Sequence, residues 1–178
     1  MSLRDSIRRL VGSGKVIPLA KVRPLTQEEE EKGRKLAGPS GIYGGSTVVV
    51  QPHSLARKLG RGPTIEIAIA GNLRPEVEKW ILAHERGHEA FLKDLIVGEN
   101  PVQSEDITLS EDEKFILDEF IADYYALGSG ASVPASYRIL EDRIKDSYPG
   151  ITRERFRELK NIAWKEASKL LSRKSRGV

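Results

Sequence analysis

The sequence contains no cysteine, and this absence excludes two kinds of site. Without cysteine the chain has neither a disulfide framework nor a zinc site built from thiolates. No apolar run approaches the ~18 residues that a membrane span needs, so we expect no transmembrane segment. The N-terminus also lacks the apolar stretch of a signal peptide, because charged residues interrupt it from Arg4 to Arg9. We therefore expect a cytoplasmic protein.

Histidine is scarce as well, since the chain has only three, yet two of them form a pattern. His84 is followed directly by Glu85, and His88 stands four positions after His84, which matches H-E-x-x-H. A shuffled chain of this composition would contain the pattern about three times in a thousand. Chance is therefore a weak explanation for it.

Helical geometry explains why this spacing suits a metal ion. Residues four apart in an α-helix are offset by only about 40° and rise about 6 Å along the axis. His84 and His88 would project from one face and could share one ion, and zinc accepts imidazole nitrogen. Glu85 would lie on the flank of this face, about 60° from His88, within reach of a metal-bound water.

The surrounding residues predict a helix that buries this face. Apolar residues and the two histidines recur at helical spacing: Val77, Trp80, Ile81, His84, His88, Phe91 and Leu95. Pro75 fits the first turn of such a helix, where its missing N–H is not needed. The alternative is two histidines that simply pack in a core or on the surface, and the position of Glu85 argues against it.

A catalytic zinc needs a third protein ligand, usually a histidine or a carboxylate. The remaining histidine, His53, lies upstream in a loop-like stretch. The better candidate is Glu119, which lies in a second predicted helix over residues 109–128. Its start is marked by Ser110 and Glu113, the pair of a capping box.

Asp123 shares the helical face of Glu119, because it follows four positions later. While Glu119 binds zinc, Asp123 could orient a ligand histidine from behind and fix its tautomer. The alternative is a pair of solvated acids, since E-x-x-x-D alone is a common pattern.

Two segments together, residues 81–89 and residues 118–126, resemble the gluzincin group of zinc metallopeptidases. The short gap between His88 and Glu119 is similar to that of minigluzincins and of peptidases associated with phage-repressor control. Arg86 departs from the apolar residue usually found at that position.

The resemblance implies a role for each matching residue. Glu85 would be the general base, and Asp123 would support the ligands from behind. The zinc ligands, carried over by position, would be His84, His88 and Glu119.

The fold implied is α+β and zincin-like: a small twisted sheet, an active-site helix with H-E-x-x-H, and a second helix with the third ligand. We expect one domain over residues 1–178. A helical extension is expected over 1–37 and a basic C-terminal helix over 152–176. Residues 47–50 and 64–70 are expected to be strands. By resemblance, residues 64–70 would be an edge strand that holds the substrate backbone in extended form.

Charge is unevenly distributed. Residues 99–123 carry a net charge of −8 and residues 153–176 a net charge of +6. The acidic segment would flank the zinc site, which suits a basic substrate. A solvated outer face on a packed helix explains the basic segment, and nucleic-acid contact is the alternative, with Trp164 as its single stacking aromatic.

The function implied is a zinc-dependent peptidase that cleaves peptide or protein substrates, as an endopeptidase rather than an exopeptidase. Zinc would lower the pKa of its bound water toward ~7, and Glu85 would take the water proton. The sequence leaves the donor to the oxyanion open among Tyr124, Tyr125, Tyr137, Arg138, Tyr148 and His53.

Three other interpretations stay open at this stage. The first is a regulatory protein on a metallopeptidase-like scaffold. The second is a nucleic-acid-binding protein with a structural zinc, whose binding would depend on salt. The third keeps the enzyme but makes it latent, with a terminal segment lying across the cleft. The oligomeric state and the natural substrate are not specified by any pattern in the sequence.

Overall fold

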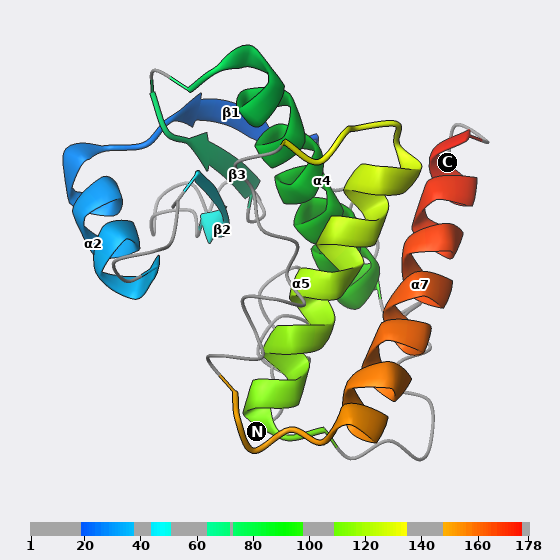
Figure 1. Ribbon diagram of the computed structural model, residues 1–178. Helices are drawn as coiled ribbons and strands as arrows, with labels where there is room; N and C mark the ends of the chain where they lie inside the picture. The colour runs from blue at the N-terminus through cyan, green and yellow to red at the C-terminus, as the bar shows by residue number, and fades with distance from the viewer. Residues whose placement is uncertain are drawn as a thin grey trace, which may run out of the picture.

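Figure 1 shows the computed structural model of the protein, which describes residues 19–37, 44–50, 64–71, 73–97, 109–134 and 148–175. Its elements in chain order are β1 (Lys21–Pro24), α2 (Gln27–Ala37), β2 (Gly45–Val50), β3 (Thr64–Ile69), α4 (Pro75–Val97), α5 (Glu111–Gly128) and α7 (Arg153–Ser175). The described part of the chain is therefore α+β, as predicted. No described helix combines the length and apolar character needed to cross a membrane.

The three strands form one mixed sheet in the order β1-β3-β2. Strand β1 runs parallel to β3, and β2 runs antiparallel to it. The prediction that residues 64–70 form an edge strand is therefore wrong, because β3 is the central strand. Ile67 and Ala68 point to opposite faces of the sheet, and both are 0% exposed. Burial on both faces is what a central, covered strand requires.

The helical extension expected over residues 1–37 contains α2, but it also contains a strand that was not predicted, β1 at residues 21–24. Contacts from far along the chain hold this strand in place. The backbone N–H of Ala20 donates to Glu89 Oε1 at 2.7 Å, and Arg86 Nη1 donates to the carbonyl of Ala20 at 3.2 Å. Helix α4 thus binds both polar backbone groups of Ala20. This constraint cannot be predicted from the residues next to Ala20 in the sequence. Residues 1–18 of this expected extension lie outside the described residues.

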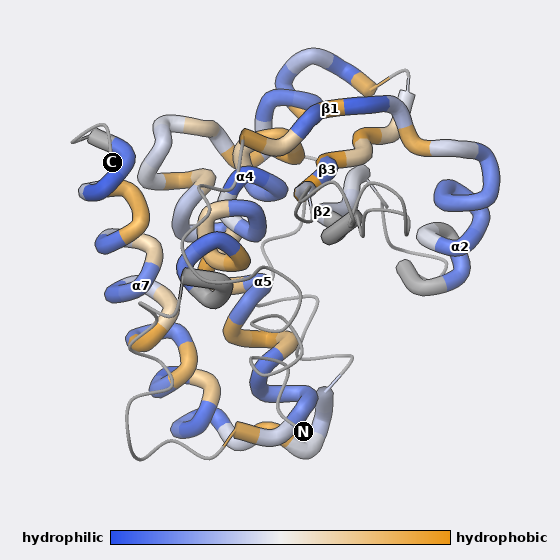
Figure 2. Tube along the Cα trace, turned by 180° about the vertical axis from the view of Figure 1, so that it is seen from behind, coloured by the Kyte–Doolittle hydropathy of each residue, from blue (hydrophilic) through white to orange (hydrophobic). Residues whose placement is uncertain are grey.

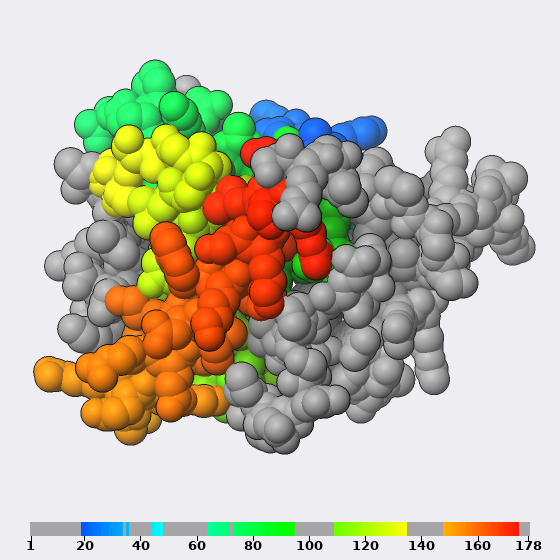
Figure 3. Space-filling view, turned by 90° about the vertical axis from the view of Figure 1, so that its right-hand side faces the viewer, coloured from blue at the N-terminus to red at the C-terminus, as the bar shows by residue number. Residues whose placement is uncertain are grey.

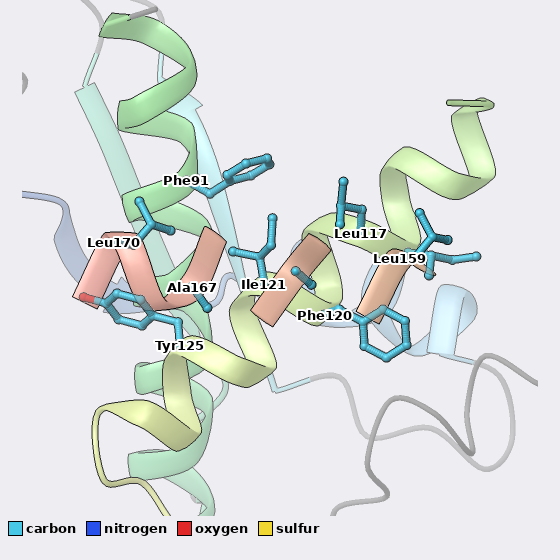
Figure 4. Close-up of a cluster of buried hydrophobic side chains, with 10 residues drawn as sticks. Phe91, Leu117, Phe120, Ile121, Tyr125, Leu159, Ala167 and Leu170 are labelled. Carbon is cyan, nitrogen blue, oxygen red and sulfur yellow. The ribbon is translucent and has the colours of Figure 1, made fainter. Parts of the chain in front are cut away.

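Helix α4 is the centre of the packing. One side of it covers β2 and β3, and its other side packs against α5, as Figure 1 shows. The core between the sheet and α4 contains Ile65, Ile67, Ile69, Val77, Trp80 and Ile81. A second core joins α4, α5 and α7, and its labelled members in Figure 4 are Phe91, Leu117, Phe120, Ile121, Tyr125, Leu159, Ala167 and Leu170.

Helix α7 belongs to this second core. Leu159 and Ala163 are 0% exposed, and the helix packs along α5. Near its C-terminal end, Arg173 Nη1 donates to both carboxylate oxygens of Asp94 on α4 at 2.7 Å. The basic helix expected over 152–176 therefore exists, and its buried face helps to hold α5 in position.

The start of α5 carries the predicted capping box. The hydroxyl of Ser110 accepts from the backbone N–H of Glu113 at 3.2 Å, and the Glu113 carboxylate accepts from the N–H of Ser110 at 2.7 Å. Arg155 of α7 also pairs with Glu113, so the cap is tied to the neighbouring helix. This pairing and the cap lower the pKa of Glu113.

Two glycines allow the backbone to approach the motif turn of α4 from both sides. A Cβ at Gly87 would lie 2.6 Å from the Cα of Ala122 on α5, closer than real contacts allow. A Cβ at Gly45 of β2 would lie 3.0 Å from Glu85 Oε1 and from the Ala68 carbonyl oxygen. The H-E-x-x-H turn is therefore packed between β2 and α5, and a side chain at Gly45 or at Gly87 would crowd the neighbouring atoms.

Replacing Gly87 with alanine should lower the free energy of unfolding by about 1–3 kcal/mol, because the new methyl group pushes α5 away from α4. Urea unfolding followed by circular dichroism measures the change. Gly71→Ala is the matched control, since its Cβ would meet nothing within 4 Å. Equal stability of the two variants would show that the close helix approach is not required.

Candidate metal centre

His84 and His88 lie side by side on the inner face of α4, where they are 5% and 9% exposed. Their rings meet edge to face with centroids 4.7 Å apart. The two Nε2 atoms are 3.1 Å apart. The helical spacing in the sequence therefore does bring both imidazoles to one point, as predicted.

The other nitrogen of each ring faces a carboxylate from α5. His84 Nδ1 lies 2.7 Å from Asp123 Oδ1, and His88 Nδ1 lies 3.1 Å from Asp118 Oδ1. Because an ionised carboxylate can only accept, we assign the ring proton of His84 to Nδ1, which donates to Asp123. The contact of His88 with Asp118 is an ion pair without hydrogen-bond geometry. The lone pair of His84 Nε2 is then directed toward His88 Nε2, and a cation near the two nitrogens would be stabilised there.

Glu119 completes the group from α5. Its Oε2 lies 3.7 Å from His84 Nε2, and its Oε1 lies 3.6 Å from His88 Nε2. One ligand atom from each of the three side chains falls within 4.8 Å of the others. The three residues that the sequence nominates as ligands are therefore close enough together to hold a metal ion.

The spacing suits a small tetrahedral ion. Zinc bound at 2.0–2.1 Å would place neighbouring tetrahedral donors about 3.3 Å apart. The two imidazole nitrogens, 3.1 Å apart, lie close to this value, and Glu119 approaches them with a different carboxylate oxygen each, at 3.6 and 3.7 Å. Two imidazoles and one carboxylate also form a donor set typical of catalytic zinc, with a fourth position left for water or substrate.

The electrostatics of the site favour a cation. Burial alone would lower the pKa of His88, but the carboxylates of Asp118, Glu119 and Glu85 outweigh it and raise that pKa to about 10. The carboxylates thus stabilise positive charge at this place. A metal ion meets the same requirement without protonating either Nε2.

Glu85 is held beside this group without being one of its ligands. Its side chain is 5% exposed, and its Oε2 accepts from the Thr47 hydroxyl at 2.8 Å. The same hydroxyl also lies 3.0 Å from the backbone carbonyl of Glu85. Burial raises the pKa of Glu85, while the two histidines and Thr47 oppose this rise. A carboxylate with a raised pKa is a stronger base.

Sequence reasoning missed two of these contacts. Asp118 directly precedes Glu119, but it was only one member of an acidic segment, and nothing marked it as a partner of His88. Thr47 lies in β2, 38 positions before Glu85, and only the tertiary fold brings them together.

The six candidates for an oxyanion donor are only partly described. His53, Tyr137 and Arg138 lie outside the described residues. Burial and the carboxylates of Asp112 and Glu119 raise the pKa of Tyr148, which places that hydroxyl within electrostatic reach of a nominated ligand.

Comparisons of the chain with protein-family models, with curated proteins and with solved structures find no match. The likeness to gluzincins therefore remains a prediction from the two motifs.

The purified protein should bind about one zinc ion per chain, and His84→Ala should lose nearly all of it, because one imidazole and one carboxylate make a weak site. Elemental analysis after dialysis measures the content. His53→Ala is the matched control and tests the alternative third ligand. Zinc retained in full by His84→Ala would contradict the ligand assignment.

Asp123→Ala should weaken zinc affinity by roughly 10–100-fold, because His84 loses the partner that fixes its tautomer. Asp118→Ala should have a smaller effect, since its contact is longer and its side chain is 37% exposed against 4% for Asp123. Competition with a chromophoric chelator measures both affinities. Asp112→Ala, on the exposed start of α5, should bind zinc like the original chain. Unchanged affinity in Asp123→Ala would refute the supporting role.

Proposed function

We propose that the protein is a zinc-dependent peptidase in which Glu85 is the general base. The observation that carries the proposal is the position of Glu85. Its carboxylate is buried next to His84, His88 and Glu119, and interacts electrostatically with all three, yet stands outside the ligand group.

Zinc held by His84, His88 and Glu119 would supply Lewis acidity at this place. Glu85 would accept a proton from the attacking water and deliver it to the leaving amine. Thr47 holds the Glu85 side chain in place through its hydroxyl. Asp123 accepts the Nδ1 hydrogen bond of His84, and Asp118 lies 3.1 Å from His88 Nδ1, so that both carboxylates act on the ring nitrogens opposite the Nε2 atoms.

The number of ligands favours catalysis over a structural metal. A structural zinc site takes four protein ligands, whereas a catalytic one takes three and leaves a position open. Among the described residues, the metal-binding group contains three. Three ligands plus an adjacent buried carboxylate is the set that hydrolysis requires.

Strand β2 supplies a place for the substrate. Within the described residues, β2 pairs with β3 along one edge and with no strand along the other. Thr47 belongs to β2 and touches Glu85, so an extended peptide added along the second edge would run past the catalytic carboxylate. The substrate-binding role that the sequence assigned to residues 64–70 thus passes to residues 45–50 in this proposal.

Glu85→Gln should keep zinc but lose peptidase activity by about 10²-fold or more, because the amide preserves shape and cannot take a proton. Hydrolysis of fluorescent casein, with zinc content measured in parallel, tests this. Glu78→Gln on the exposed side of α4 is the matched control. If the zinc-loaded protein cleaves no unstructured substrate, the peptidase function is contradicted. If Glu85→Gln remains active, the role of Glu85 as the base is contradicted.

A further inference from the structure

Helix α7 carries a polar and aromatic stripe beside its buried face. The stripe consists of Arg153, Arg157, Lys160, Asn161 and Trp164. These positions follow one another at steps of four, three, one and three, so they share one side of the helix. The buried face is formed by other positions, among them Leu159, Ala163, Ala167 and Leu170. Figure 2 shows the same division, with the hydrophobic side of α7 toward α5 and the hydrophilic side outward.

This stripe forms one wall of an open depression of about 940 Å³, and two tyrosines contribute to the other side. Tyr124 comes from α5, and Tyr148 precedes α7. Tyr124 meets Trp164 edge to face, with ring centroids 5.3 Å apart. Trp164 is nonetheless 56% exposed, an unusual state for the largest apolar side chain. With Phe156, four aromatic side chains therefore line the depression, where the sequence indicated one.

Positively charged side chains also line the depression. Its lining contains Arg153, Arg157 and Lys160 and no acidic residue. Neither Arg153 nor Arg157 forms an ion pair with an acid in the described part of the chain. Other bases of α7 serve packing instead, since Arg155, Lys169 and Arg173 pair with Glu113, Glu166 and Asp94. Figure 3 shows α7 exposed along one face of the molecule.

We propose that this stripe binds single-stranded nucleic acid. A phosphate backbone matches the cations, and unpaired bases can stack on exposed aromatic rings, whatever their sequence. A duplex would satisfy the cations alone, because its bases are already stacked on each other. An acidic peptide would also leave the rings unused. The combination of bases without acids and of accessible aromatics favours a single strand over both.

The proposed surface shares no residue with the metal centre, whose ligands lie on α4 and α5. Nucleic-acid binding and zinc hydrolysis can therefore be tested separately. Full binding by Glu85→Gln and by His84→Ala is the expected result. Loss of binding in a folded Glu85→Gln chain would overturn the proposal of a separate surface.

The first experiment is a titration of the full chain with labelled oligothymidine and oligouridine of about 20 nucleotides, followed by fluorescence anisotropy. Phosphate contacts of Arg153 and Arg157 predict that log K falls with log salt at a slope of about −1.4. Tryptophan emission should also be quenched. Trp80 is 1% exposed, so stacking would quench Trp164.

Variants separate the contribution of base stacking from that of the phosphate contacts. Trp164→Ala should weaken binding by about 5-fold or more at every salt concentration, because a stacking partner is lost. Arg153→Ala combined with Arg157→Ala should reduce the salt slope by about 1.4, at 0.7 for each lost phosphate contact. Lys165→Ala is the matched control, since it removes an exposed charge from α7 outside the stripe and should leave the quenching unchanged. Circular dichroism checks that each variant is folded.

Other ligands that could bind this surface predict different results. Polyglutamate that competes as well as oligothymidine at equal charge would show a surface for acidic polymers and overturn the proposal. Tighter binding to duplex than to single strands, or binding unaffected by Trp164→Ala, would also overturn it. The absence of any binding at low salt would overturn the proposal as well.

Discussion

The close approach of α5 to α4 at Gly87 is the constraint on which the metal centre depends. Gly87 lies within the H-E-x-x-H turn, between Glu85 and His88, and faces the backbone of Ala122. Glu119 and Asp123 lie on either side of Ala122 in the sequence. A wider separation of the helices would move the third ligand and the support of His84 away from the histidines together. One missing side chain thus determines whether two helices form a site or only a packed pair.

Carboxylates then give the site its chemical character. Those of Asp123 and Asp118 engage one nitrogen of each histidine, which leaves the other nitrogen free to coordinate a cation. Glu119 completes the group that could hold a metal ion, and Thr47 of β2 holds Glu85 beside it. All four acids come from two helices that cross once, so a short stretch of each helix is enough to build the centre.

Local sequence patterns were sufficient to predict the helices and most residues of the candidate site. The stripe around His84 and His88 depends only on helical spacing, and the start of α5 depends on a four-residue cap, so both could be predicted from neighbours in the sequence. The ligand group followed because Glu119 occupies the expected face of the next helix. Asp118 could not be found in this way, since its role arises from the angle at which the two helices cross.

The sheet was harder to predict because its signals are not local. Glu66 interrupts the apolar run of β3 and suggests a strand with a solvated edge, but Arg23 of β1 pairs with it at 3.0 Å. The ion pair makes a polar residue compatible with a central strand. Strand β1 itself is four residues long and ends in Pro24, and its position depends on Glu89 holding Ala20. Neither contact can be predicted from the residues that neighbour it in the sequence.

The burial of so many charged groups at one point has a consequence for folding itself. Glu85 and Asp123 are each at most 5% exposed, and negative charges confined in this way repel unless a cation lies among them. A metal ion bound at this group would therefore contribute part of its binding free energy to folding. A ligand that binds only the folded state adds about 1.4 kcal/mol of stability for each tenfold rise in its free concentration above the dissociation constant. The fraction of folded chain would then report the local supply of metal, and a chelator would act on this protein as a mild denaturant.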